Sequence, residues 1–568
     1  MTTTARFGKR SKEIGLLFQK SNLKRIWEVY TWKQLRDMDI KDLFDYYDYN
    51  YRIALEAEDL RSQLMSGEFF PSPPIHYKLE KKMGICRHMV IPTPSDALIL
   101  QLLTEEIRED IIKESPTKKA FYSRDKSSKQ KGLHEVTSSD YETWFDIWKK
   151  YQMEILAFIN SHDFLVLTDV TNFFDNVNLE KLRDYLSSTF HIKEHILDII
   201  FLILNQICWT PDYMQMSAKF LPTVNIESIR LLAHSMLFEL DSVMFDHVGE
   251  NYTRWMDDVV FGSKDYDFSS RVLGDASDVL KSRGLALNLS KTCMYSSDEA
   301  KFHYQIEQNK ILDDYNLLET TEISEGTVKR IMDEFLDYRA PENKNINAKH
   351  RNRIIKRYFT LFSKLGAEIP SWIIKDALIK SPDVRPSTIK YLLSVGYSST
   401  TSKLILEIMP KLRKHGDTIL FDICNTLTLW NIRRDDDGHN FIEAFDTQLF
   451  QICDYKNNQF DFYSSLWFRA KYYSPRKLLE FILKFENYWK KYRFLQRQVT
   501  AVLPRIRDQT ALNLIKRQST SSVKEVSTLA NAILDIMSTN KDKFKFYVIP
   551  QKLILLLDLC SFARCLCR

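Results

Sequence analysis

Glycine and proline are scarce in this chain, which has 14 glycines and 16 prolines among 568 residues. Both residues interrupt helices and favour turns, so their scarcity argues against a loop-rich fold and favours long helices. Long apolar runs are absent as well: the longest, ILDIIFLIL at 196–204, is too short to cross a bilayer and contains Asp198. The amino-terminal stretch has a basic start without an apolar core behind it, unlike a secretory signal. We therefore expect a cytoplasmic protein with no membrane contact.

An excess of charge of either sign is lacking too. The chain has 80 basic and 75 acidic side chains, and its formal net charge is +5. Such a balance neither requires nor excludes a nucleic-acid partner, because local patches matter more than the sum. The eight cysteines are mostly isolated, and no histidine lies near the closely spaced Cys560, Cys565 and Cys567. This pattern predicts reduced thiols, with neither a disulfide framework nor a zinc site.

The residues that are present predict two kinds of structure along the chain. Hydrophobic residues make up 44% of the sequence, which is enough for two or more domains with their own cores. The first part mixes helices with strands, including a hairpin that turns near Gly84 and a buried strand over 163–177. The rest of the chain has the pattern of amphipathic helices. The predicted fold class is α+β, with one domain over 1–320 and an all-α domain of irregular, HEAT-like helical repeats over 321–568.

Three acidic residues stand where an apolar β core would normally exclude them. Asp169 lies in the predicted strand, and Asp257 and Asp258 lie together inside the segment NYTRWMDDVVFGSK. Buried carboxylates are costly unless a cation neutralises them, and Mg²⁺ binds a few carboxylates together with substrate phosphates. The acids therefore predict a nucleotidyl-transfer site in which two ions activate a hydroxyl and stabilise the leaving pyrophosphate. The alternative is three unrelated acids at strand ends or facing solvent.

Five segments resemble, in the same order, the sequence motifs of reverse transcriptases. They are RHMVIPTPSDALILQ (fingers), AFYSRD (between fingers and palm), DVTNFFDNV (motif A), RWMDDVVF (motif C) and GLALNLSKT (motif D), at 87–101, 120–125, 169–177, 254–261 and 284–292. The order of the five is more specific than any one of them, and the resemblance covers roughly residues 75–295. It implies a right-hand polymerase fold with fingers and palm.

The resemblance also implies a role for individual positions. Asp169 and Asp257 would be ligands of two Mg²⁺ ions, for which Mn²⁺ can substitute, and Asp258 would complete this catalytic cluster. Phe174 stands where an aromatic ring excludes a ribose 2′-hydroxyl, which favours deoxynucleotides. The remaining positions would contact phosphates: the backbone N–H groups of Asn172 and Phe173, the charges of Arg87 with Lys78 or Lys82, and Lys291 near the pyrophosphate. For the three lysines, an ordinary solvated surface position is the alternative.

Two departures from the motifs concern the handling of a template. The segment KFLPTVNIESIRLLAHSMLFELD (219–241) stands at motif B but lacks its two glycines, and Asn225 takes the place of the second. Asparagine tolerates positive φ, so a turn can survive there, but the groove beside the template and base pair would be altered. Trp255 replaces the usual tyrosine of motif C. These changes argue against the standard handling of a template.

The combination of an altered motif B with a long helical carboxy-terminal part resembles the bacterial abortive-infection reverse transcriptases of the AbiK and AbiA kind. That resemblance implies phage defence and template-independent DNA synthesis from dNTPs that starts on a protein hydroxyl. It also implies a homo-oligomer, trimer or hexamer, carrying covalently attached single-stranded DNA, with RNA as a further candidate partner. The priming candidates lie in KDLFDYYDYNYR (41–52), for which a helix with packed aromatic rings is the plainer interpretation: Tyr46, Tyr47, Tyr49 and Tyr51.

Three alternatives stay open on the sequence. A conventional RNA-templated reverse transcriptase of retron or group II intron descent would keep the three acids but suits the altered motif B less well. Arg434 and His439 have the Arg-x₄-His spacing of HEPN ribonucleases, although the DDDG between them predicts an exposed loop and hence a chance match. A non-catalytic nucleic-acid binder would use the basic stretch 344–357, which equally fits the solvated face of a helix.

Overall fold

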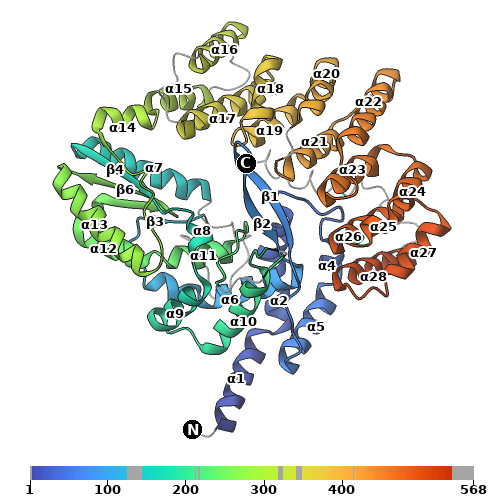
Figure 1. The fold of residues 1–568 in the computed structure, drawn as a ribbon, viewed down its shortest axis with the longest axis horizontal. Helices are drawn as coiled ribbons and strands as arrows, with labels where there is room; N and C mark the ends of the chain where they lie inside the picture. The colour runs from blue at the N-terminus through green and yellow to red at the C-terminus, as the bar shows by residue number, and fades with distance from the viewer. Residues whose placement is uncertain are drawn as a thin grey trace. The chain divides into compact units, whose positions relative to one another are not determined.

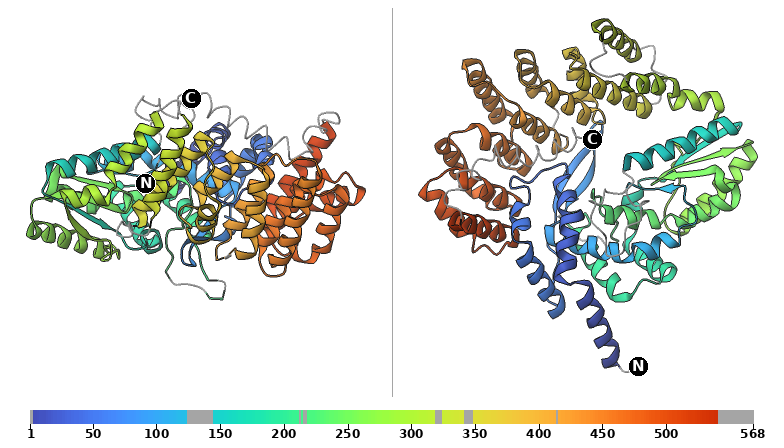
Figure 2. Two further views of the ribbon diagram at one scale, coloured as in Figure 1. Left: turned by 90° about the horizontal axis from the view of Figure 1, so that it is seen from above. Right: turned by 180° about the vertical axis from the view of Figure 1, so that it is seen from behind.

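The chain divides into two compact units. Unit 1 comprises Met1–Met38, Arg52–Tyr77 and His88–Tyr304, and unit 2 comprises Asp39–Tyr51, Lys78–Arg87 and Gln305–Arg568. Figure 1 shows the ribbon, and Figure 2 shows it from two further sides. This computed structural model describes residues 3–123, 144–211, 213–214, 218–317, 324–340, 348–412 and 415–539. Two short segments of the amino-terminal part thus belong to the same unit as the carboxy-terminal helices, and the predicted domain limits at 320 and 321 stay a prediction.

Unit 1 is built around a five-stranded mixed sheet. In spatial order its strands are β3 (Ala120–Phe121), β5 (Tyr252–Trp255), β6 (Asp258–Ser263), β4 (Phe164–Asp169) and β7 (Cys293–Ser296). Strand β3 is parallel to β5, and the other neighbours are antiparallel. Figure 1 shows α7 (Trp144–Ser161) on one side of these strands and α12 (Phe238–Val248) and α13 (Tyr266–Ser282) on the other, and all three helices contact them. Coverage on both sides explains why β4 and β6 read as apolar runs.

The strand predicted over 163–177 is shorter in the structure. Strand β4 ends at Asp169, and Asn172 adopts a left-handed conformation with φ of 43°. A short helix, α8 (Phe173–Asn176), follows directly. The prediction was wrong beyond Asp169 because the apolar composition continues through FF, whereas the backbone reverses at an asparagine that tolerates positive φ.

The predicted hairpin near Gly84 is confirmed. Strands β1 (Ile75–Lys82) and β2 (Ile85–Ile91) form a separate two-stranded sheet. Met83 and Gly84 make the turn, with φ values of 49° and 83°. Positive φ at both positions is the pattern of a type I′ turn, whose twist matches that of the flanking strands.

Helices complete unit 1 around the sheet. Helix α6 (Pro94–Lys113) begins at Thr93, whose side chain accepts a hydrogen bond from the Asp96 N–H. Asn178 caps α9 (Leu179–Phe190) in the same way. The other helices of this unit are α1 (Thr3–Leu17), α2 (Lys20–Ile26), α3 (Trp32–Arg36), α5 (Ile53–Ser66), α10 (Glu194–Ile207), α11 (Glu227–Ser235) and α14 (Ser297–His303). Such side-chain caps satisfy N–H groups that have no partner within the helix.

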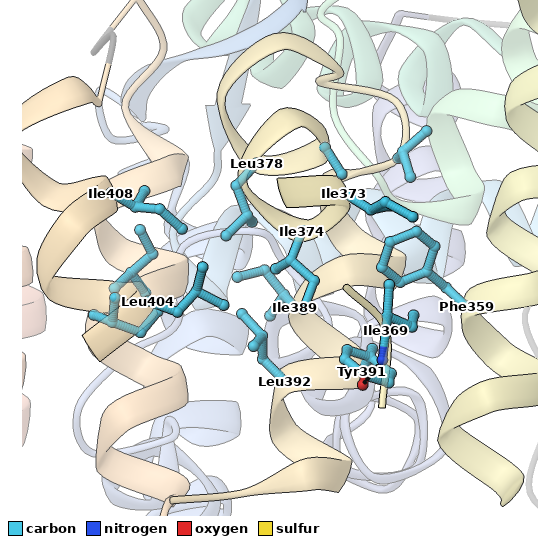
Figure 3. Packing of buried hydrophobic residues seen from close by; sticks show 14 of the residues in the cluster. Phe359, Ile369, Ile373, Ile374, Leu378, Ile389, Tyr391, Leu392, Leu404 and Ile408 are labelled. Carbon is cyan, nitrogen blue, oxygen red and sulfur yellow. Dashed lines mark hydrogen bonds between the residues drawn. The ribbon is translucent and has the colours of Figure 1, made fainter. Parts of the chain in front are cut away.

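Unit 2 contains helices and no β-strand among its described residues after 304. Figure 3 shows part of its core, where Phe359, Ile373, Leu392 and Leu404 come from four different helices. Whether these helices form a repeat stays a prediction. They are α15 (Ile306–Leu317), α16 (Glu325–Arg339), α17 (Ala348–Leu365), α18 (Ser371–Lys380), α19 (Arg385–Val395), α20 (Ser399–Ile408), α21 (Thr418–Leu429), α22 (Asp436–Ile452), α23 (Gln459–Tyr472), α24 (Pro475–Lys484), α25 (Glu486–Trp489), α26 (Arg493–Val502), α27 (Gln509–Gln518) and α28 (Lys524–Thr539).

Some predictions concern residues outside the described ranges. They are the three carboxy-terminal cysteines, Arg124 and Asp125 of AFYSRD, and Lys344 of the basic stretch. Within the described ranges, no helix combines the length and the apolar character that crossing a membrane requires.

Candidate active site

The three acids of unit 1 meet at the edge of the five-stranded sheet where β4 ends and β6 begins. Asp169 is the last residue of β4 and is paired in register with Asp258, the first residue of β6. Directly opposed residues of antiparallel strands project from the same face, about 5 Å apart at Cβ. Asp257 lies in the two-residue turn that precedes Asp258. The Val170 N–H donates to the Asp257 carbonyl at 3.2 Å, which ties this turn to the end of β4.

The local electrostatics resist full ionisation of this cluster. The pKa of Asp257 is raised from 3.8 to about 7, first by burial and then by the charges of Asp169 and Asp258. A neighbouring negative charge disfavours a second one, as does removal from water. The protein alone therefore leaves negative charge at this edge of the sheet incompletely compensated.

The ammonium group of a lysine contacts the cluster. Lys291, on the segment after α13, donates from Nζ to Asp169 Oδ2. Burial alone would lower the pKa of Lys291, but the hydrogen bond to Asp169 and the three carboxylate charges raise it. The sequence placed Lys291 near a pyrophosphate; the structure places its ammonium on a predicted metal ligand. The other oxygen, Asp169 Oδ1, is buried and has no hydrogen-bond partner among the described residues.

The donor set suits divalent metal ions by its chemistry. Carboxylate oxygens are the ligands that Mg²⁺ prefers, and Asp169 Oδ1 is a buried acceptor with nothing to accept from. As the side chains stand, the described residues contain no group of three His, Cys, Asp or Glu arranged to hold a metal. The Lys291 ammonium supplies the positive charge that a metal ion would otherwise bring to Asp169. Metal binding would therefore require Lys291 to leave Asp169 and the carboxylates to reorient.

The residues after Asp169 form a tight turn beside the acids. Asn172 is exposed, with φ of 43°, and the Asn176 side-chain amide donates to the Thr171 carbonyl at 2.9 Å. Phe173 is buried, whereas Phe174 is half-buried, and their rings meet edge to face with centroids 5.6 Å apart. The turn thus keeps one aromatic ring in the core and leaves part of the other accessible.

The segment at motif B differs from the turn that its sequence suggested. Asn225 does not take positive φ, and its side-chain oxygen accepts a hydrogen bond from Arg230 Nη1 at 2.7 Å. Arg230 also donates from Nε to the Ser123 carbonyl at 2.8 Å. The Thr223 carbonyl accepts from the Val90 N–H at 3.1 Å, so this loop runs beside β2. An arginine side chain therefore organises the loop that glycines would shape in a templated enzyme.

Trp255, the residue that replaces the motif C tyrosine, packs in an aromatic cluster. Its ring lies 4.8 Å from that of Trp148 and 5.9 Å from that of Tyr151, measured between centroids, and both partners come from α7. The tryptophan therefore anchors the β5–β6 hairpin to a helix on one face of the sheet.

Three predicted phosphate-binding residues lie in unit 2, whereas the acids lie in unit 1. Arg87, Lys78 and Lys82 all carry exposed side chains on the β1–β2 hairpin. The backbone of Lys78 pairs with Asp417: its N–H donates to Asp417 Oδ2 at 2.7 Å, and its carbonyl accepts from the Asp417 N–H at 2.8 Å. The grouping of these cations with the acids stays a prediction.

The four candidate priming tyrosines differ in burial. Tyr46 and Tyr49 are buried, and the Arg497 guanidinium lies 5.3 Å from the centre of the Tyr46 ring. Burial, together with the Asp42 charge, raises the pKa of Tyr46 well above its ordinary value. Tyr51 is 43% exposed and stacks on the half-buried Tyr47 at 6.3 Å. The prediction of packed rings with some exposed tyrosines agrees with this arrangement, and Tyr51 is the most accessible of the four.

The Arg434 and His439 pair does not lie on one helix in the structure. Asp435 caps α22, which begins at Asp436, so the loop predicted across DDDG was wrong; Arg434 lies before the helix and His439 within it. Two exposed residues on different elements do not form the helical pair of a HEPN ribonuclease.

In the basic stretch, Arg351 donates to the Arg339 carbonyl at 2.8 Å and Arg357 donates to Asp313 at 2.5 Å. These two arginines are thus occupied within unit 2.

A buried ion pair beside the acids was not predicted from the sequence. Arg254, three residues before Asp257, is bonded to Asp241 of α12, and neither side chain is exposed to solvent. The available signal was an arginine in a strand too apolar to solvate it, which implies a buried acidic partner. The identity of that partner could not be read from spacing, because it comes from a helix preceding the strand.

The known proteins similar to this chain match it only in part. No family model matches the sequence. The chain is 31% identical over 140 residues to the Retron Ec48 reverse transcriptase of Escherichia coli, a stretch covering 24% of this chain. That stretch is 32% of the retron protein, so the chain spans about a third of the length of this curated relative. The match supports a reverse-transcriptase-like protein.

A comparison with solved structures adds little. The structure of apo telomerase from Candida tropicalis covers 75% of this chain, and the chain covers 73% of telomerase, at 10% identity and a TM-score of 0.28. A TM-score this low carries no argument about the fold.

Proposed function

We propose that this protein is a nucleotidyltransferase of the reverse-transcriptase type that synthesises DNA in antiviral defence by abortive infection. The observation that carries the proposal is the pairing of Asp169 with Asp258 on neighbouring strands, with Asp257 in the adjoining turn. Three carboxylates on one edge of a sheet are costly unless the reaction uses them. The partial match to a retron reverse transcriptase supports the same reaction class.

The reaction would use the acids as metal ligands. Two bound Mg²⁺ ions, or Mn²⁺ in their place, would supply activation of the attacking hydroxyl and charge stabilisation of the leaving pyrophosphate. Asp169, Asp257 and Asp258 would hold them, and the orphaned Asp169 Oδ1 supports that assignment. Lys291, once released from Asp169, would offer positive charge or a proton to the pyrophosphate. Phe174 would pack against the sugar and exclude a 2′-hydroxyl, which selects dNTPs.

The nucleotide's phosphates would need further cations and donors. Arg87, with Lys78 or Lys82, would bind the triphosphate through charge-assisted hydrogen bonds. The exposure of all three side chains supports their availability. The backbone N–H groups of Asn172 and Phe173 would complete the contacts.

Synthesis without a copied template is the finer part of the proposal. The loop at motif B has no glycine, and Arg230 bonds the side chain of Asn225 there. This arrangement supports a groove unlike that of templated enzymes. The product would be single-stranded DNA attached to the protein, and Tyr51 is the priming candidate that its exposure favours. The resemblance to abortive-infection reverse transcriptases adds that the protein would assemble as a trimer or hexamer, in a bacterial cytoplasm.

A conventional templated reverse transcriptase is the second candidate. The observation that favours it is the 31% identity to a retron enzyme. The two candidates share the acids and differ in whether a template is read.

Labelled single dNTPs separate the candidates. Purified protein is incubated with Mg²⁺ and each dNTP, with and without a primed RNA template, and the products are sized on a denaturing gel. Untemplated synthesis predicts equal incorporation in both arms and label that stays with the protein until protease treatment. Strict dependence on the added template would overturn it in favour of the retron-like enzyme. Intact mass spectrometry after nuclease digestion, comparing wild type with Tyr51→Phe, then tests the priming residue, and plating of phage on cells carrying Asp257→Asn tests defence.

A further inference from the structure

A fully buried polar network lies directly behind the turn that carries Asp257. Arg254 of β5 donates from Nε to Asp241 Oδ1 at 2.7 Å and from Nη2 to Asp241 Oδ2 at 2.5 Å. The Tyr252 hydroxyl donates to the same Asp241 Oδ1 at 2.6 Å. The side chains of Arg254 and Asp241 are both 0% exposed. The guanidinium is therefore held in one orientation by a bidentate carboxylate, which itself is fixed by a tyrosine.

The remaining nitrogen of this guanidinium reaches the turn. Arg254 Nη1 donates to the Met256 carbonyl at 2.7 Å. That carbonyl belongs to the peptide bond joining Met256 to Asp257, so the contact fixes the plane from which Asp257 departs. Met256 has φ of 54°, a left-handed conformation that costs a side-chain-bearing residue about 1–2 kcal/mol.

The backbone around the same peptide is held from two further sides. The Met256 N–H donates to the Phe121 carbonyl of β3 at 2.9 Å. The Asp257 carbonyl accepts from the Val170 N–H at 3.2 Å. Of the three contacts, that of Arg254 is the one made by a side chain, and hence the one that substitution can remove while leaving the strand ladder intact.

Stability is a poor explanation for this network. A buried ion pair can often be replaced by apolar residues of similar volume without loss, because desolvation offsets the attraction. An apolar pair, however, cannot donate to the Met256 carbonyl. What the arginine supplies, and leucine or methionine cannot, is an oriented donor at the turn.

We infer that Arg254 is a positioning residue for Asp257. It orients the Met256–Asp257 peptide, and Asp241 and Tyr252 orient it in turn, so that the Asp257 carboxylate is presented to metal ions together with Asp169. This inference rests on the proposed function, because it assigns the network to the geometry of the same acids.

The test replaces the pair without leaving a buried charge. In the double variant Arg254→Met, Asp241→Leu, circular dichroism and the melting temperature report folding. We expect a native spectrum and a moderately lower melting temperature, because the buried Tyr252 hydroxyl and the Met256 carbonyl each lose a hydrogen-bond partner. The kcat for dNTP incorporation should fall about 10- to 100-fold with KM within about twofold, because misplacing a catalytic group by about 1 Å has costs of this size. Mn²⁺ affinity, measured by electron paramagnetic resonance of free Mn²⁺, should weaken about tenfold.

A matched control uses another arginine–carboxylate pair of unit 1. Arg283 donates to Glu239 through Nε and Nη2 at 2.6 and 2.5 Å, and among the described residues it makes no hydrogen bond to the turn. The double variant Arg283→Met, Glu239→Leu should leave kcat and Mn²⁺ affinity at wild-type values. Wild-type kcat and Mn²⁺ affinity in the Arg254 double variant would overturn the inference.

Two further results keep the outcomes distinct. If the double variant does not fold, Tyr252→Phe decides: it deletes one hydroxyl, and we expect a two- to fivefold loss in kcat and in Mn²⁺ affinity, whereas unchanged values would overturn the inference. If wild-type protein incorporates no dNTP at all, the proposed function fails. The Mn²⁺ measurement then still separates a metal site shaped by Arg254 from one that ignores it.

Discussion

The two hairpins with two-residue turns, β1–β2 and β5–β6, begin their turns with the same residue type in the same conformation. Met83 has φ of 49° and Met256 has φ of 54°. Their surroundings are opposite: Met83 is 87% exposed, whereas Met256 is 8% exposed. The second turn residue also differs, being Gly84 with φ of 83° in one hairpin and Asp257 in the other, which does not take positive φ. The same conformation at the first turn residue thus occurs once in an exposed turn and once in a buried one.

The β1–β2 hairpin is held by its strands rather than by its turn. Lys78 pairs through its backbone with Asp417, and a Cβ added at Gly416 would lie 2.9 Å from the Glu80 nitrogen. Glu80 is bonded to Arg385 at 3.0 Å, with each side chain 7% exposed. These contacts bind the segment 78–87 into unit 2 and leave the Met83 side chain of the turn exposed.

The β5–β6 hairpin is organised around its turn. Arg254 donates to the carbonyl between the two turn residues, and Trp255 packs against α7. Burial and a dedicated donor thus accompany the hairpin that carries the acids, whereas the contacts of the segment 78–87 hold it within unit 2.

The largest effect is expected at the buried turn. Asp257→Asn should lower dNTP incorporation by about 1,000-fold or more, because it removes a metal ligand from the reaction. Its melting temperature without metal should equal or exceed that of wild type, since a neutral amide relieves repulsion from Asp169 and Asp258. Differential scanning calorimetry alongside the incorporation assay checks both halves. A large loss of stability would make the acid a structural residue and contradict the proposed site.

The docked hairpin should respond in stability instead. Arg385→Ala should cost about 3 kcal/mol of unfolding free energy, because Glu80 would stay buried without its partner. Adding Glu80→Gln should recover much of that loss, since the amide oxygen still accepts from the Gly84 N–H. Urea unfolding measures both, with Arg476→Ala as the exposed control, expected within about 0.5 kcal/mol of wild type. If Arg385→Ala lowered the unfolding free energy less than Arg476→Ala, the Glu80–Arg385 contact would contribute nothing to stability.

His234, which feels the charge of Arg254 in the network behind the buried turn, leads us to expect that the protein loses stability at acidic pH. Burial and then the Arg254 charge lower the pKa of His234 well below its ordinary 6.5, and its ring lies against those of Tyr122 and Phe238. The unfolded chain therefore binds a proton that the folded chain does not. Stability from this group is complete above pH 6.5 and is lost as pH falls below it, by up to about 1.4 kcal/mol per pH unit.

Urea midpoints between pH 7.5 and 5 for wild type and His234→Phe check this loss. The variant should lack this component of the pH dependence, whereas the exposed His439→Gln should retain it. Parallel curves for wild type and His234→Phe would exclude a neutral buried His234.

The smallest effect is expected at the exposed turn. Asparagine is favoured before glycine in a type I′ turn, so Met83→Asn should raise unfolding free energy by about 0.5 kcal/mol. Met256→Asn, at the same φ, should instead lower it by about 2 kcal/mol, because it buries an amide and loses apolar burial. Parallel urea titrations measure both changes in unfolding free energy. Opposite signs would confirm that the two turns differ in burial, and equal signs would contradict it.

Local features of both hairpins could be predicted from the sequence. Gly84 between two alternating segments indicated the first turn, whereas only the resemblance of RWMDDVVF to motif C implied the second. The extent of β4 could not be predicted, because FF after Asn172 continues the apolar pattern while the backbone turns. Long-range partners were also hidden: Asp417 for Lys78 and Asp241 for Arg254 depend on how distant segments pack. For the same reason Lys291 was assigned to phosphate rather than to Asp169.

The decisive experiment measures incorporation of single labelled dNTPs by wild type, Asp257→Asn and Asp278→Asn. Asp278 is an exposed acid of α13, paired with Lys281 at 3.6 Å, so it controls for the loss of a carboxylate as such. With Mg²⁺ present, the account predicts equal incorporation by wild type and Asp278→Asn and none above background by folded Asp257→Asn. Undiminished incorporation by Asp257→Asn would contradict it.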